Sequence, residues 1–169
     1  MMKKLMIALA VTSLPAVASA DFMDAAWAKK ACDMWNSNAT LTGKLAGDAW
    51  MANDGGRGYK TIQMYRTACG AGSKVQITIQ DQNGKAMCTY GGKPDGKKFD
   101  GSFDYIMHAS DEHWTCIGNG DSFCGPKMAM ATGKLKFSGP KLEAMSVLGP
   151  FEQFLLLTGK VGGDKTPCK

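Results

Sequence analysis

The side chains that could best form an acid–base cluster lie next to one another in the sequence. His113 follows Asp111 and Glu112, and His108 is the only other histidine. An imidazole beside two carboxylates could serve as an acid–base group, but Ser110 before them is a good helix cap, and acidic residues stabilise the first turn of a helix. The sequence also has no Gly-x-Ser-x-Gly, no glycine-rich phosphate loop and no His-Glu-x-x-His. We therefore expect a capped helix here, no catalytic residues and no enzymatic activity.

The twelve methionines are a second set that could do chemistry, because thioethers bind Cu(I). Met128 with Met130, or Met64 with Met107, could supply such ligands. The methionines are nevertheless spread along the chain and form no Met-x-x-Met repeat. Methionine is also a flexible apolar side chain that suits pockets for irregular apolar guests. The pattern favours an apolar pocket over a Cu(I) site, and we predict neither a metal nor a cofactor.

All six cysteines follow residue 20, and an even number of cysteines in an exported chain is typical of disulfides. No Cys-x-x-Cys occurs, so zinc and haem sites have little support. Cys116 and Cys124 are the pair we expect, because the Gly-Asn-Gly loop between them can fold one back on the other. Cys69 and Cys88 should lie at two strand spacings, roughly 10 Å apart, which is beyond disulfide reach. Other pairings among Cys32, Cys69, Cys88 and Cys168 remain open.

Residues 1–20 have the parts of an export signal. Lys3 and Lys4 form a basic start, Leu5–Leu14 is apolar, and Ala18–Ala20 is a small-residue cleavage site. The apolar run is too short to span a membrane. We expect cleavage at the end of this segment and a mature protein that is periplasmic or secreted.

The mature chain is only mildly basic, since loss of two leader lysines lowers the formal charge from +5 to +3. The remaining basic residues are scattered and form no stripe, so nucleic-acid binding has little support. A weak, transient contact with an anionic membrane surface stays open. The length suits one domain with its own core, and we expect a monomer.

The apolar pattern predicts an α+β domain. Apolar residues recur at helical spacing in residues 21–36, which predicts an amphipathic first helix. Period-2 alternation between turn residues predicts four strands, of which the first three form an antiparallel meander. These strands are Tyr59–Thr67, Lys74–Gln80, Lys85–Tyr90 and Phe103–His108. With a fifth strand at Lys134–Phe137, we expect a five-stranded, mostly antiparallel sheet with helices packed on one face.

The last apolar segment should consist of two helical parts. Pro140 suits the start of a helix whose stripe would hold Leu142, Met145 and Leu148. The Gly-Pro pair at 149–150 should break this helix, and an apolar run then continues to Leu157. From the pattern alone, this run closes an ordinary core.

A resemblance gives this segment a sharper interpretation. GKLKFSGPKLEAM (residues 133–145), preceded by FDYIMHASDEHW (residues 103–114), resembles the closing half of the sterol carrier protein type-two domain. The order, spacing and residue types match over about residues 57–158. The resemblance implies a sterol-carrier-like lipid-binding domain at 57–160, with an N-terminal helical segment at 21–56 and a tail at 161–169.

The resemblance further implies a non-catalytic carrier that holds a sterol, a fatty acyl chain or a similar hydrophobic molecule in an apolar tunnel between sheet and helices. By position, the implied tunnel residues are Ile106, Trp114, Met128, Met130, Phe137, Leu142, Met145, Leu148, Phe151, Phe154 and Leu155. The leader, the six cysteines and the extra N-terminal helix depart from the family pattern and leave the ligand open. The alternative is a tunnel filled by side chains, which would make the chain a disulfide-stapled envelope interaction protein.

Overall fold

Five strands form one mixed sheet in the order β3-β2-β1-β4-β5. The computed structural model describes residues 20–47 and 50–168. The strands are β1 (Lys60–Arg66), β2 (Val75–Gln82), β3 (Lys85–Gly92), β4 (Tyr105–Ala109) and β5 (Lys136–Ser138). The helices are α1 (Ala25–Asn36), α2 (Ala39–Lys44), α3 (Asp111–Asn119), α4 (Pro126–Ala131), α5 (Lys141–Ser146) and α6 (Leu148–Val161), with short 3-10 turns at Thr67–Cys69 and Ala71–Ser73. The predicted α+β class with a five-stranded sheet is confirmed.

Strands β1, β2 and β3 form the expected antiparallel meander. The β2–β3 turn places Asn83 and Gly84 at φ 56° and 74°, the left-handed angles that a tight hairpin turn requires and that Asn-Gly adopts readily. Strand β4 pairs with β1 in parallel, and β5 pairs with β4 in the antiparallel direction. Three of the four pairings are therefore antiparallel.

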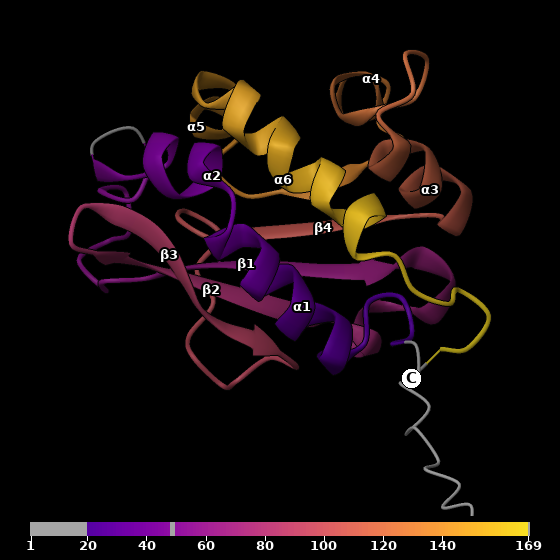
Figure 1. Cartoon of the computed structure of the whole chain (residues 1–169), viewed down its shortest axis with the longest axis horizontal. Helices are drawn as coiled ribbons and strands as arrows, with labels where there is room; N and C mark the ends of the chain where they lie inside the picture. The colour runs from indigo at the N-terminus through magenta and orange to yellow at the C-terminus, as the bar shows by residue number, and fades with distance from the viewer. Residues whose placement is uncertain (1–19, 48–49, 169) are drawn as a thin grey trace, which may run out of the picture.

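The helices cover one face of the sheet. Helix α1 packs on β2 and β3, and α6 lies beside α1, α2 and α3 (Figure 1). Alternating residues of the central strands point into this layer, among them Ile62, Met64 and Met107, each with no exposed surface. All four tryptophans are buried in the same core, so the segment before β1 packs on the sheet together with the rest of the chain.

Three disulfides tie the periphery to this core. Cys32 on α1 is bonded to Cys88 on β3, Cys69 after β1 to Cys168 in the tail, and Cys116 to Cys124 across the loop after α3. The disulfide between Cys116 and Cys124 is the one that the short glycine loop predicted. Cys69 and Cys88 have different partners, as their strand separation requires.

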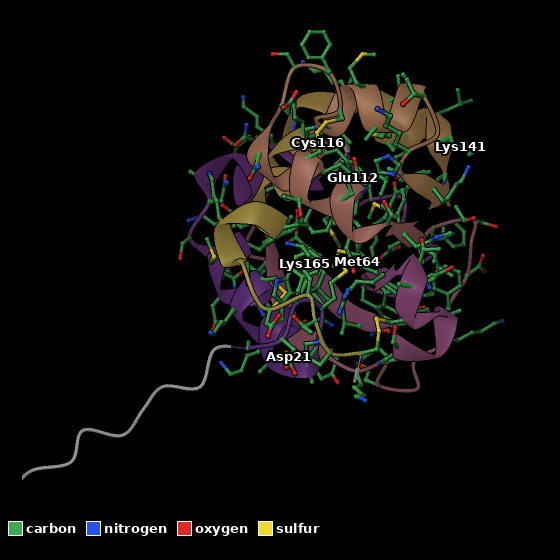
Figure 2. The ribbon with its side chains drawn as sticks, turned by 90° about the vertical axis from the view of Figure 1, so that its right-hand side faces the viewer. Asp21, Met64, Glu112, Cys116, Lys141 and Lys165 are labelled. Atoms are coloured by element: carbon green, nitrogen blue, oxygen red, sulfur yellow. A yellow bond between two sulfur atoms is a disulfide. The ribbon has the colours of Figure 1, made fainter. Side chains whose placement is uncertain are left out.

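The two ends of the described chain lie side by side. The backbone N–H of Phe22 donates to the carbonyl of Asp164 at 2.7 Å, and the tail carrying Lys165 passes next to Asp21 (Figure 2). Apart from Ala20, the expected export signal lies outside the described residues. Within residues 20–47 and 50–168, no helix combines the length and the apolar character needed to cross a bilayer.

The closing segment breaks at a different residue from the one expected. Helix α5 ends at Ser146, and α6 already contains Gly149 and Pro150 in its first turn. A proline is tolerated there because the first N–H groups of a helix have no intrahelical partner. Val147, with φ −113° and ψ 33°, therefore separates the two helices.

Helix α5 also turns a different face inward. Leu142 and Met145 are 89% and 55% exposed, whereas Ala144 is fully buried and the Glu143 side chain is only 11% exposed. The expected apolar stripe through Leu142, Met145 and Leu148 is therefore wrong. The reason is an ionic contact that places Glu143 against the sheet.

Candidate functional site

A lysine lies inside the core layer at the start of β1. Lys60 occupies the same face of the strand as Ile62 and Met64, because side chains two residues apart point the same way. Its ammonium has no exposed surface and donates to the carbonyls of Asn53 and Trp50 at 2.9 and 3.3 Å. A charged group in such a place is stable only when it is paired and hydrogen-bonded.

The partner of this ammonium comes from α5. Both oxygens of Glu143 accept from Lys60 Nζ, at 2.7 Å for Oε1 and 2.8 Å for Oε2. The turn before α5 sets this approach, since Gly139 has φ 134° and a Cβ there would lie 2.5 Å from the carbonyl oxygen of Asp104. A glycine at this point lets the chain cross β4 closely enough for a six-residue helix to deliver its carboxylate.

Two aromatic residues complete the polar cluster around Glu143. The hydroxyl of Tyr105 donates to Oε2 of Glu143, and Trp50 Nε1 donates to the Tyr105 oxygen at 2.9 Å. The ammonium of Lys60 lies 4.6 Å from the ring centre of Trp50 and 5.5 Å from that of Tyr105, within cation–π range. Trp50 and Tyr105 thus serve both as polar partners and as apolar walls.

Burial changes the pKa values of two residues in this cluster, Lys60 and Tyr105. Desolvation lowers the pKa of Lys60 below its ordinary value, although hydrogen bonding and charge attraction from Glu143 oppose it. Burial raises the pKa of Tyr105 strongly, and the hydrogen bond to the Glu143 carboxylate adds to the rise because that bond requires the phenol proton. At neutral pH, the Tyr105 hydroxyl is therefore protonated and donates its hydrogen bond to the Glu143 carboxylate.

An aromatic cluster continues from this polar end into the core. The ring centre of Tyr105 lies 5.4 Å from that of Phe137 and 5.6 Å from that of Phe151, and Phe151 lies 5.9 Å from Phe154. Trp35 extends the cluster, 5.6 Å from Phe154. Such edge and tilted contacts are the geometries that aromatic pairs prefer.

The structure divides the eleven residues predicted to line a tunnel into four groups. Trp114, Phe151, Phe154 and Leu155 are at most 2% exposed and belong to the core. Met130, Phe137 and Leu148 are partly buried, and Met130 and Phe137 pack against the core. Met128, Leu142 and Met145 are exposed at the surface. Ile106 lies on the sheet face opposite the helices, because its neighbours Tyr105 and Met107 point toward them.

The buried group is packed rather than arranged around an open channel. A side chain beside an empty space as wide as a water molecule would retain accessible surface, yet Trp35, Trp114, Phe151, Phe154 and Leu155 retain 2% or less. Large aromatic rings occupy the space between sheet and helices at these positions. In this conformation, the layer where a tunnel was expected is filled.

The opposite end of β1 carries a second buried cation. Arg66 donates to Asp111 at 2.7 and 2.6 Å and to the tail carbonyl of Pro167 at 2.5 Å. Ser110 caps α3 as expected by accepting from the N–H of His113. Arg66 therefore connects the end of β1 to α3 through Asp111 and to the C-terminal tail through Pro167.

The candidate copper ligands lie in two different settings. Met64 and Met107 are register neighbours on β1 and β4 and are fully buried in the apolar core. Met128 and Met130 are on α4, the first exposed and the second partly buried. The two pairs belong to different layers of the fold.

Lys60, Glu143, Trp50 and Tyr105 were not predicted as site residues from the sequence. A signal for the lysine was present, because the strand KTIQMYR places Lys60 and Arg66 on the same face as Ile62 and Met64. Two cations on an otherwise apolar face require buried anions. The sequence did not indicate which acids would supply them.

Comparison with solved structures supports the fold. The chain superposes on the crystal structure of sterol carrier protein 2 with a TM-score of 0.51 and 14% identity, covering 84% of this chain and 100% of that one. A conserved hypothetical protein of Thermus thermophilus gives 0.47 and 16% identity over 89% of this chain and 98% of its own. The sterol carrier protein domain 2 of Helicoverpa armigera gives 0.44 and 21% identity over 80% and 90%. No protein-family model and no curated protein sequence matches. The superposition on sterol carrier protein 2 shows that the chain has a sterol-carrier-like fold.

Proposed function

We propose that this protein is an exported, non-catalytic carrier of a lipid or another hydrophobic small molecule. The observation that carries the proposal is a sterol-carrier-like fold whose aromatic core is closed at one end by a short helix, α5. The ligand would lie between the sheet and helices α5 and α6, along the row that begins at Lys60 and continues through Ile62 and Met64. The described conformation is then the closed, unloaded form.

Loading requires α5 to move, and the structure gives this helix little to hold it. Its one fully buried side chain is Ala144, and the ionic contact of Glu143 is its main attachment to the sheet. A helix of six residues has little stability of its own. Helix α6 buries Phe151, Phe154 and Leu155, so the rings of Phe151 and Phe154 would also have to move aside to make room for the ligand.

The exposed apolar side chains support contact with a membrane surface during loading. Phe123 is 85% exposed, and with Met128, Leu142 and Met145 it lies on the α3–α4 loop, α4 and α5. Helices α4 and α5 lie at the same edge of the molecule, on either side of α6 (Figure 1). Lysines from these elements, including Lys141 at the surface in Figure 2, suit anionic lipid headgroups.

The test is native mass spectrometry of the mature protein purified from the cell envelope, followed by organic extraction. A co-purified lipid, and displacement of a fluorescent fatty acid by that lipid, are the expected results. A ligand-free mass together with no binding of the fluorescent fatty acid would contradict the carrier function.

The filled core favours a second candidate function, a disulfide-stapled envelope protein that binds another macromolecule. Its supporting observation is the near-complete burial of Trp35, Trp114, Phe151, Phe154 and Leu155 in the unliganded chain. Under this alternative the aromatic cluster is permanent core, and apolar ligands of any headgroup leave the thermal midpoint unchanged. A carrier instead gains stability from bound ligand, by an amount that rises with the logarithm of the ratio of ligand concentration to Kd.

A further inference from the structure

The carboxylate of Glu143 occupies a site built for an anion. Both of its oxygens accept hydrogen bonds from Lys60 Nζ, at 2.7 and 2.8 Å, and one of them also accepts from the Tyr105 hydroxyl. The ammonium has no exposed surface and is oriented by two backbone carbonyls, so it cannot turn to solvent for an alternative partner. The donors belong to β1 and β4, which are rigid sheet strands, whereas the acceptor belongs to the short helix α5.

The same site lies at one end of an apolar row. Beyond Lys60, the core-facing side chains of β1 are Ile62 and Met64, and those of β4 are Tyr105 and Met107. A molecule with an anionic head at Lys60 would lay its tail along these residues. From Lys60 to Met64 this row spans about 13 Å at ~3.3 Å per residue, and the Arg66–Asp111 ion pair ends it, so the row would take the part of an alkyl chain next to its carboxylate.

We propose that Lys60, Tyr105 and Trp50 form the headgroup site for the carboxylate of a long-chain fatty acid, and that Glu143 fills this site when the protein is empty. The inference rests on the proposed carrier function and specifies its ligand. On loading, the ligand's carboxylate replaces that of Glu143, and α5 moves away with its own carboxylate returned to water.

This exchange avoids the main cost of opening a buried ion pair. Removing one partner of such a pair leaves an uncompensated charge, which is strongly unfavourable. Here one carboxylate succeeds another, so Lys60 keeps an anion and Tyr105 keeps an acceptor throughout.

The experiment compares two fluorescent probes that differ only in the head, a long-chain fatty acid and the corresponding alcohol, on delipidated mature protein with intact disulfides. The wild type is expected to bind the acid more tightly than the alcohol. Glu143→Gln removes the resident carboxylate and should strengthen binding of the acid by about tenfold, with a smaller change for the alcohol.

The role of Lys60 is tested on the Glu143→Gln background, where no buried carboxylate is left unpaired. Adding Lys60→Met should weaken binding of the acid by about tenfold or more relative to Glu143→Gln alone, and leave the alcohol within about twofold. Circular dichroism and the thermal midpoint check that each variant is folded. Glu112→Gln on α3 and Lys85→Gln on β3 each remove one exposed charge of the same sign as Glu143 and Lys60, respectively, and should leave both affinities unchanged.

The outcomes separate this inference from the function on which it rests. Equal affinity for acid and alcohol in the wild type and in all variants overturns the headgroup site but leaves a carrier of uncharged lipids. If the wild type binds neither probe, both the carrier function and the headgroup site are overturned. A selective loss of acid binding with Lys60→Met supports both.

Discussion

The ammonium of Lys60 lies 2.7 Å from Oε1 of Glu143, although the two residues are 83 positions apart in the chain. The contact joins the first strand of the sheet to a short helix near the end of the domain. It accounts for three observations at once: the tolerance of a lysine in the core, the inward position of a glutamate on α5, and the outward position of Leu142 and Met145.

The ion pair should stabilise the closed form mainly through the cost of breaking it. Lys60→Met leaves a largely buried carboxylate without its cation and should lower the free energy of unfolding by about 3 to 5 kcal/mol. The double variant Lys60→Met/Glu143→Gln should recover much of this loss because no charge remains buried. Urea unfolding of the two single variants, the double variant and the wild type measures the coupling. Additive effects of the single changes would show that the two side chains act independently.

Tyr105 should remain protonated well above pH 10. Its pKa is raised in the folded state, so its contribution to stability is complete below the ordinary value of 10.0 and is lost as the pH rises beyond it, because only the unfolded state then releases the proton. Lys60 acts in the opposite direction, since its lowered pKa makes stability rise toward pH 10.5. Absorbance titration of tyrosine should show Tyr105 ionising only on unfolding, and Tyr105→Phe should remove that late phase. Ionisation of all four tyrosines without unfolding would contradict the buried hydrogen bond.

Phe154 should behave as a core residue in the unliganded protein. It is 2% exposed and packs against Trp35 and Phe151, so Phe154→Ala should lower the free energy of unfolding by about 3 to 5 kcal/mol. Leu142→Ala, at a position 89% exposed, is the matched control and should stay within about 0.5 kcal/mol. A small loss for Phe154→Ala would show that this part of the core is already loosely filled.

The exposed apolar side chains of α5 should matter for membranes rather than for folding. Met145→Asp places a negative charge on a residue that is 55% exposed, so it should leave the thermal midpoint nearly unchanged while reducing sedimentation with anionic vesicles. Added salt should also weaken vesicle binding by the wild type, because it screens the attraction between lysines and anionic headgroups. Undiminished vesicle binding by Met145→Asp would place the membrane contact elsewhere.

The disulfide from Cys69 to Cys168 should contribute most to stability among the three. It links residues separated by 99 positions, whereas Cys116 and Cys124 are separated by 8. On the loop-entropy model these correspond to about 4.7 and 2.5 kcal/mol. Replacing each pair by alanine and comparing urea midpoints checks the order, and non-reducing peptide mapping verifies the pairings in the wild type. An equal loss for both pairs would mean that loop length does not govern their effect.

Much of the secondary structure followed from local chemistry. The period-2 alternation between turn residues predicted the strands of the β2–β3 hairpin, and Ser110 predicted the start of α3. These features depend on backbone angles and side-chain periods within a few residues, which a sequence displays directly. The same local patterns predicted a five-stranded sheet with helices on one face, and the resemblance to sterol carrier domains added the expectation of an apolar tunnel between them.

The site depended on contacts between distant segments. By itself, the sequence determined the strand periods, the helix cap and the even set of cysteines, because each is encoded within one short stretch. Only the tertiary structure decided that Glu143 faces Lys60, that Val147 rather than Gly149 separates α5 from α6, and that aromatic rings fill the layer between sheet and helices. A buried charge must find its counter-ion wherever the fold brings one, and that requirement overrides the apolar stripe that α5 would otherwise present.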